Sequence, residues 1–177
     1  MKTPNHLRPL RLPLAATLAA LAAACAQPPP KTEAPPPRPT HDAVAAVRAA
    51  GKGDDSVIQV QPLRDPAVDG FLREAETAEA QGRLDAAATA AGRALKLAPE
   101  APEILQYLAE IELAQGHLQA AEEHAMHSYR LGPRLGGLCA RNWQVLVETR
   151  LQLGDPERRA EAERQVKECR KAPPTRM

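Results

Sequence analysis

The sequence predicts an all-α fold, a short solenoid of about three helical hairpins that follows a disordered, proline-rich tether. The first observation behind this prediction is an internal repeat, since AQGRLDAA at 80–87 recurs as AQGHLQAA at 114–121. The second is that LAP at 97–99 recurs as LGP at 131–133 with the same spacing of 34 residues, a period typical of stacked helical hairpins. The third is a group of seven prolines at 28–39, a composition that favours an extended polyproline conformation and cannot bury a core.

The repeat resembles the tetratricopeptide family, whose unit is a helix-turn-helix of this length. Gly82 and Gly116 stand where that family turns between its two helices, and Ala87 and Ala121 stand where the helices cross closely. A third, degenerate repeat follows if four residues are inserted before it, which places Trp143 at the family's tryptophan position. The predicted helices are 66–81, 85–97, 102–115, 119–131, 139–153 and 156–171.

Two Asp-Pro pairs mark helix starts inside this region. In Asp65-Pro66 and Asp155-Pro156, the aspartate is suited to cap the helix and the proline to occupy its first position. A single hairpin cannot bury its own apolar face. We therefore expect the hairpins to stack into one core, with the last and more polar helix covering its end.

The N-terminus has the pattern of an export signal. Three basic residues precede an apolar run that is too short to span a bilayer but has the length of a signal-peptide core. LAAAC at 21–25 resembles the bacterial lipobox, which implies that Cys25 is lipidated and becomes the mature N-terminus. Ala26, where an aspartate would signal retention in the inner membrane, implies transfer to the periplasmic leaflet of the outer membrane. The alternative is an ordinary secretory signal in which Cys25 is incidental.

These observations divide the chain into four parts. Within the linker, HDAVAAVRAA at 41–50 could form a short helix, but it is not long enough to be stable alone. We expect a monomer. The predicted parts are a lipoprotein signal peptide (1–24), the lipidated cysteine with a proline-rich flexible linker (25–65), a tetratricopeptide-repeat domain (66–171) and a disordered tail (172–177).

The composition and motifs argue against several function classes. Removal of the signal peptide lowers the number of Lys and Arg from 23 to 20, against 22 Asp and Glu, and this weakly acidic balance does not suit a nucleic-acid partner. No phosphate-binding loop or H-E-x-x-H motif is present, so we expect no catalytic residue and no cofactor. His117, His124 and His127 could bind a metal weakly, but a solvated helix face is the simpler interpretation and we predict no metal site.

The two remaining cysteines suit a disulfide. Cys139 begins the first helix of the third hairpin and Cys169 lies near the end of the second, and antiparallel helices bring these two ends together. An oxidising compartment such as the periplasm permits the bond. The alternatives are two small buried apolar residues or, least favoured, a thiol nucleophile, for which neither cysteine has a histidine nearby in sequence.

The expected binding surface is the groove that first helices line in tetratricopeptide proteins. Its candidates are mainly acidic, and the basic residues with which some relatives grip a peptide C-terminus are missing. The loop RLGGLCARNW is a rival site, although Trp143 could instead pack in the core and the charged helix faces could be merely solvated. The predicted partner-binding residues are Asp69, Leu72, Glu76, Glu79, Glu103, Gln106, Glu110, Arg134, Arg141 and Trp143.

The layout as a whole resembles a known family. A lipidated cysteine, a proline-rich tether and a small tetratricopeptide domain together are similar to the LpoP-type outer-membrane lipoproteins that activate bifunctional penicillin-binding proteins. The resemblance implies a non-enzymatic periplasmic protein whose partner is a class A penicillin-binding protein. The competing interpretations are an assembly factor or pilotin-like scaffold for an envelope complex and, from another class, a periplasmic metal-binding protein.

Overall fold

The computed structural model describes residues 42–52 and 64–170. The predicted signal peptide, Cys25, the prolines at 28–39 and the tail at 172–177 lie outside these ranges, so the statements made about them remain predictions. Within the described ranges every regular element is an α-helix. The helices are α1 (Ala43–Ala50), α2 (Pro66–Ala80), α3 (Leu84–Leu97), α4 (Pro102–Gln115), α5 (Leu118–Leu131), α6 (Gly137–Leu153) and α7 (Pro156–Glu168).

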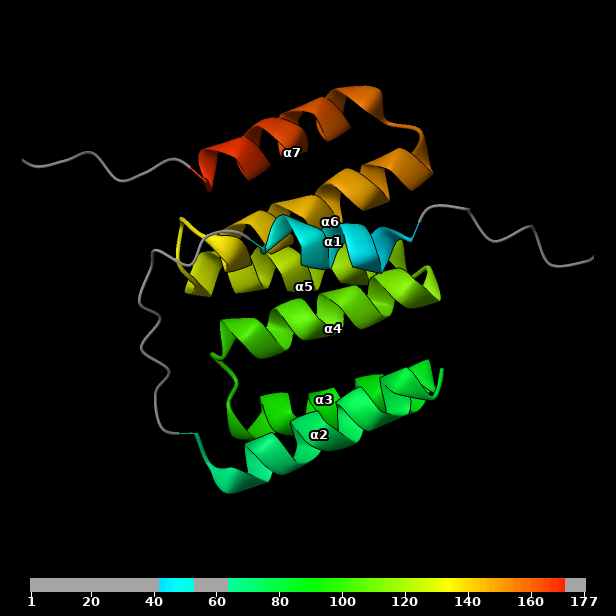
Figure 1. Ribbon diagram of the computed structural model, residues 1–177, viewed down its shortest axis with the longest axis vertical. Helices are drawn as coiled ribbons and strands as arrows, with labels where there is room; N and C mark the ends of the chain where they lie inside the picture. Colours follow the sequence, from blue (N-terminus) through cyan, green and yellow to red (C-terminus); the bar gives the residue numbers. More distant parts are fainter. Residues whose placement is uncertain (1–41, 53–63, 171–177) are drawn as a thin grey trace, which may run out of the picture. The chain divides into compact units, whose positions relative to one another are not determined.

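The helices from α2 to α7 form antiparallel hairpins that stack one on the next (Figure 1). Each first helix pairs with the helix that follows it, as α2 with α3, α4 with α5 and α6 with α7. The predicted all-α solenoid is confirmed, with the first helices on the near side of Figure 1 and α3 and α5 behind them. The helix boundaries are close to those predicted, although α6 begins two residues earlier and α7 ends three residues earlier.

Each hairpin turns on a glycine in the left-handed region. Gly82, Gly116 and Gly154 have φ angles of 72°, 80° and 66°. A Cβ atom at any of the three would meet no atom of the described residues within 4 Å, so the described surroundings leave space for a side chain there. The backbone conformation is what favours glycine, because side-chain-bearing residues rarely adopt positive φ. The recurrence of glycine at fixed spacing in the sequence thus records a turn geometry that recurs in the fold.

The two Asp-Pro pairs start helices as the sequence predicts. The side chain of Asp65 accepts a hydrogen bond from the backbone N–H of Ala67 at 2.8 Å, at the start of α2. The side chain of Asp155 accepts one from the backbone N–H of Arg158 at 3.1 Å, at the start of α7. These bonds satisfy amide groups that the helix itself leaves without a partner.

Small residues dominate the helix crossings. Ala87 and Ala121, the two alanines of the repeat pattern, are completely buried. An alanine at a crossing lets two helix backbones approach closely, but it removes little apolar area from water. The larger apolar side chains come mainly from α4, in the middle of the stack, with Ile104, Leu105 and Ile111 each about 1% exposed.

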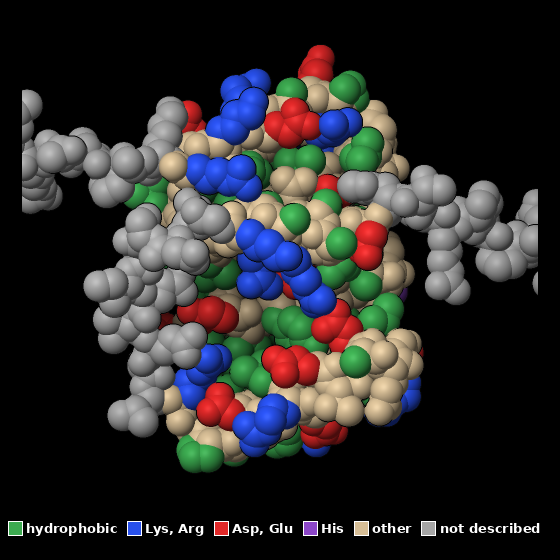
Figure 2. Space-filling view, viewed as in Figure 1, with side chains coloured by type: hydrophobic (Ala, Val, Ile, Leu, Met, Phe, Trp, Pro, Cys, Tyr) green, Lys and Arg blue, Asp and Glu red, His purple; other side chains and the backbone are tan. Residues whose placement is uncertain are grey.

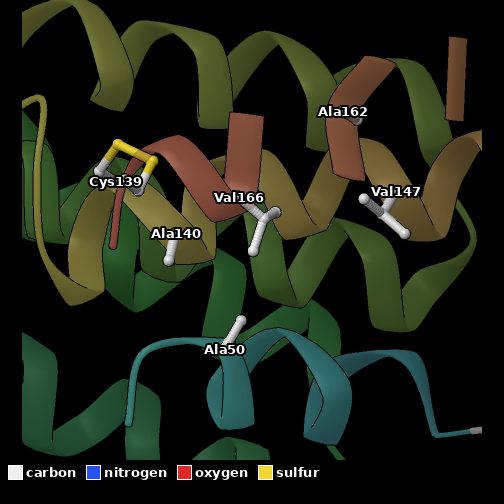
Figure 3. Packing of buried hydrophobic residues seen from close by; sticks show 7 residues of the cluster. Ala50, Cys139, Ala140, Val147, Ala162 and Val166 are labelled. Atoms are coloured by element: carbon white, nitrogen blue, oxygen red, sulfur yellow. A yellow bond between two sulfur atoms is a disulfide. The ribbon is translucent and has the colours of Figure 1, made fainter. Parts of the chain in front are cut away.

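A disulfide fixes the third hairpin. Cys139 at the start of α6 and Cys169 just after α7 are bonded, with their Cα atoms 5.6 Å apart. Figure 3 shows the bond beside the buried cluster to which Ala140, Val166 and, from α1, Ala50 belong. The predicted bridge is therefore present in the structure. The two cysteines hold together the helix ends that lie farthest from the Gly154 turn.

Helix α1 changes the boundary of the folded part. The predicted linker at 25–65 contains residues 43–50, yet these form a helix that packs against α6 and α4 (Figure 1). The helix is too short to be stable in isolation, so its order depends on this packing. The correction to the linker is that the fold begins at α1, which is separated in sequence from the helices that it contacts.

Candidate functional site

The face formed by α2, α4 and α6, called here the first-helix face, carries α1. The side chain of Asp42 caps α1 by accepting a hydrogen bond from the Ala45 N–H at 2.9 Å. Ala43, Val47 and Ala50 follow at spacings that place them on one side of the helix. This side meets the domain, because Val47 and Ala50 are buried and Ala43 is partly buried.

Val47 is the apolar anchor of α1. It is fully buried and belongs to one cluster with Ala109 and Leu113 of α4 and Val145 of α6. Full burial of a valine side chain stabilises by about 1.5 kcal/mol or more relative to exposure. The anchor thus lies between two first helices, where the predicted groove would run.

Arg48 is the polar anchor. Its Nε donates to Glu110 Oε2 at 2.8 Å, and one of its terminal nitrogens donates to Glu79 Oε1 at 2.7 Å. Partial burial alone would lower the pKa of Arg48, but the hydrogen bonds to the two carboxylates outweigh it and raise the pKa. Arg48 therefore remains charged and links α1 to α2 and α4.

Glu110 is the centre of a buried ionic network. Its carboxylate has no exposed surface and accepts hydrogen bonds from Gln106 Nε2 at 3.0 Å, Arg48 Nε at 2.8 Å and Arg141 Nε at 2.9 Å. A buried carboxylate needs such partners, because an unpaired one loses its hydration without compensation. Two guanidinium groups, one from α1 and one from α6, supply the opposite charge.

Tyr107 extends the network toward α2. Its hydroxyl donates to Glu79 Oε2 at 2.9 Å, so Glu79 binds both Tyr107 and Arg48. Burial and then the hydrogen bond to Glu79 raise the pKa of Tyr107 well above its usual value. The tyrosine is therefore a neutral donor at physiological pH, and the face presents two carboxylates held in fixed positions.

The structure brings four of the predicted groove residues together and leaves the others apart. Glu79, Gln106, Glu110 and Arg141 all belong to the network around Arg48. Their role as free groove contacts needs correction, because α1 and its arginine already occupy them. The rest lie elsewhere on the face: Leu72 is partly buried against the core, Asp69 pairs with Arg64 at 3.8 Å, and Glu76 and Glu103 are exposed.

The predicted loop site packs around one aromatic ring. The guanidinium carbon of Arg134 lies 4.1 Å from the centre of the Tyr129 ring, a cation–π contact. Trp143 meets the same ring edge-on, with 5.2 Å between ring centres. The alternative in which Trp143 packs in the core matches this arrangement, since Trp143 borders the cluster that contains the disulfide.

Two hollows flank the face. One, of about 610 Å³, lies where α2 begins and α3 passes into α4, and Val68, Leu97 and Glu103 are among its lining residues. The other, of about 480 Å³, lies between α1 and α7, and Ala46, Ala49 and Gln144 help to line it. Figure 2 shows acidic side chains bordering a recess with hydrophobic side chains between α4 and α2.

His117, His124 and His127 are not grouped as a metal centre in the described part of the chain. His117 Nδ1 lies 2.8 Å from Glu112 Oε2, an exposed hydrogen bond. Among the described residues no three His, Cys, Asp or Glu side chains are grouped so that they could hold a metal ion. In the same ranges no helix combines the length and the apolar character needed to cross a membrane.

Sequence reasoning missed the residues that fill the face. Arg48, Val47 and Ala50 were assigned to the linker, although their spacing and the Asp42 cap fit a helix with one apolar side. Tyr107 was also missed as a partner of Glu79. The cap at Asp42 and the spacing of the apolar residues could have indicated α1, but the sequence did not predict the surface on which this helix docks. Arg48 and Glu110 are 62 positions apart.

Comparison with known proteins gave an informative likeness among solved structures. No protein-family model matches the chain, and no curated protein matches it. Among solved structures, the chain is similar to the globular C-terminal domain of LpoP from P. aeruginosa, with 30% sequence identity and a TM-score of 0.56. The similarity covers 59% of this chain and 99% of that domain. It therefore includes nearly all of the solved domain and is more than a shared helical architecture.

Proposed function

This chain belongs to the LpoP family, and we propose that it is an outer-membrane lipoprotein whose helical domain binds and activates a bifunctional peptidoglycan synthase, a class A penicillin-binding protein. The observation that carries the proposal is the similarity to LpoP over 99% of that solved domain at 30% identity. The sequence adds a lipobox-like segment ending at Cys25 and a proline-rich spacer after it.

The domain acts by binding rather than by chemistry. A domain that contacts the active conformation of a synthase more favourably than the inactive one shifts the equilibrium between them. A roughly 100-fold shift requires a difference in binding free energy of about 2.7 kcal/mol. A few well-placed contacts on a small surface supply that amount, so a domain of this size suffices.

The surface offered to the partner is the uncovered part of the first-helix face. Glu76 and Glu103 are exposed on α2 and α4, and both are outside the ionic network around Glu110. Acidic side chains on a rim set the rate and specificity of association, and reversing their charge places like charges across the interface, which costs several kcal/mol. A basic patch on the synthase is the complementary surface.

The test is a glycan-polymerisation assay with the class A penicillin-binding proteins of the source organism, with and without the soluble chain from residue 26 onward. We expect stimulation of one synthase and loss of binding in a Glu76→Lys, Glu103→Lys double variant that keeps its helical circular dichroism. The matched control is Glu123→Lys, an exposed charge reversal on α5, which should bind like the wild type.

Failure of every synthase to bind or respond would reject the proposal. The protein would then be treated as a scaffold for envelope assembly, and crosslinking in cells would identify its partner.

The proposed lipid anchor at Cys25 has its own test. Replacement of Cys25 by serine should abolish incorporation of labelled palmitate and release the protein from the outer-membrane fraction, whereas an ordinary secretory signal would leave both unchanged.

A further inference from the structure

The contact between α1 and the first-helix face buries polar groups where a permanent core would bury apolar ones. Gln106 and Glu110 have at most 1% of their surface exposed. Both belong to a first helix, whose exposed side in a helical-repeat protein is a surface for ligands. The same pair recurs on α6, where Gln144 donates to Glu148 as Gln106 does to Glu110. The buried polar groups under α1 therefore belong to a repeated surface pattern that α1 covers.

The polar groups of this surface are not all satisfied. Gln106 Oε1 is buried and has no hydrogen-bond partner among residues 42–52 and 64–170. Such an atom usually has one, because desolvation without compensation costs about 1–3 kcal/mol. Beside α1, the hollow of about 480 Å³ is lined in part by Ala46 and Ala49, whose side chains are too small to fill it. A helix with larger or polar side chains at these positions would complete the contact.

The attachment of α1 is also weak by its own composition. The helix has eight residues, of which only Val47 and Ala50 are buried. Apart from Arg48, every side chain of the helix is that of alanine or valine. An isolated helix of this length is not stable, so α1 keeps its structure only while it remains docked. The covalent connection of α1 to the domain offsets this weak attachment, because a tethered segment has an effective concentration of the order of millimolar at its binding surface.

We infer that α1 is an intramolecular occupant of a helix-binding surface, and that a partner helix of the same chemistry takes its place there. The occupant has an arginine directly after a β-branched residue and small residues around them. The arginine binds Glu79 and Glu110, and the β-branched side chain enters the site of Val47. The partner helix differs from α1 by carrying a hydrogen-bond donor that reaches Gln106 Oε1.

Charge complementarity supports this choice of occupant. Glu79 and Glu110 are fixed by Tyr107 and Arg141, so two carboxylates remain in place when α1 leaves. Departure of Arg48 removes one of the two guanidinium groups that compensate Glu110. A neutral or acidic helix would leave Arg141 alone to compensate Glu110 and would cover the carboxylate of Glu79 without replacing its ion pair with Arg48. The surface therefore selects a helix that brings an arginine.

The first experiment needs no knowledge of the partner. A fluorescein-labelled peptide with the sequence of residues 42–52 is titrated into the soluble chain from residue 26 onward, followed by fluorescence anisotropy. Val47→Asp, which puts a charge into the apolar site, should release α1 and strengthen peptide binding at least about 10-fold over the wild type. Ala45→Asp, on the exposed side of α1, is the matched control and should behave as the wild type.

Two further readouts keep the test independent of stability. Hydrogen exchange of the amides in α1 should accelerate at least about 10-fold in Val47→Asp, while the amides of α4 and α6 stay protected. Should Val47→Asp unfold the domain, Arg48→Ala supplies a milder release with the same expected direction. Peptide binding that is equal in the wild type and both release variants, or absent from folded release variants, would overturn the inference.

The identity of the partner rests on the proposed function, and one comparison separates the two. If a synthase supplies the helix, the Val47→Asp chain should bind it at least about 10-fold more tightly than the Ala45→Asp chain. Peptide exchange without any binding of a synthase would uphold the helix-binding surface and reject the proposed function. Binding of a synthase equally by both variants, with no peptide exchange, would uphold the proposed function and reject α1 as the occupant that a partner displaces.

Discussion

The disulfide of the third hairpin permits a quantitative prediction. The bond between Cys139 and Cys169 spans 30 positions in the sequence. In the chain-entropy model, closing a loop of that length lowers the free energy of the folded state relative to the unfolded state by about 3.6 kcal/mol at 25 °C. Small domains have a total stability of about 5–15 kcal/mol, so the bond accounts for a large share. The Cys139→Ala, Cys169→Ala double variant should therefore lose about 3–4 kcal/mol.

The assay is equilibrium unfolding in urea, followed by circular dichroism, with oxidised and reduced samples of the wild type and the double variant. The wild type should shift to a lower midpoint on reduction, and the dependence on urea should steepen because the reduced unfolded chain exposes more surface. The double variant is its own control, since a reducing agent has no bond to break in it. A loss below about 1 kcal/mol in the double variant would refute the reasoning from loop entropy.

Two further predictions concern a turn and a titrating group. Gly116→Ala should lower the free energy of unfolding by about 1 kcal/mol, because alanine disfavours the φ of 80°. The control Gly92→Ala lies inside α3, where a Cβ atom meets no described atom within 4 Å, and should raise the free energy of unfolding by about 0.5 kcal/mol. Urea midpoints of the two variants that move in the same direction would contradict this. For Tyr107, whose folded-state pKa is raised, the proton is held more tightly in the folded chain. Its contribution to stability is present below about pH 10, the unfolded value, and is lost as pH rises further. The free energy of unfolding of the wild type should thus fall toward that of Tyr107→Phe between about pH 10 and 12, and a constant difference would exclude the effect.

The repeated unit was predictable because its determinants are local. The turns at Gly82 and Gly116, the small residues at Ala87 and Ala121 and the cap at Asp65 each act within one hairpin. Their recurrence at a fixed spacing gave the stacking order as well. The disulfide was predictable for a related reason, since antiparallel pairing of adjacent helices fixes which ends meet.

The contents of the site were not predictable in the same way. Glu110 has the sequence context of an exposed groove residue, yet in the structure it is buried and bonded to Arg48 of α1. The propensity of eight residues for helix is too weak to indicate a stable element, because nearly all of its stability comes from contacts with α4 and α6. Sequence reasoning placed the predicted groove residues on helices that the structure contains but could not show that α1 already contacts some of them.

On the proposal that Cys25 is a lipid anchor, the docking of α1 also sets how far the domain can lie from the membrane. With Cys25 as the lipid anchor that we propose, residues 26–41 connect the anchor to the described part of the chain and would span about 50 Å in a polyproline conformation at roughly 3.1 Å per residue. Release of α1 would lengthen the linker between Cys25 and the rest of the domain to residues 26–63, which would span about 120 Å in the same conformation. An exchange of one short helix for another would then more than double the radius within which the domain can find a partner.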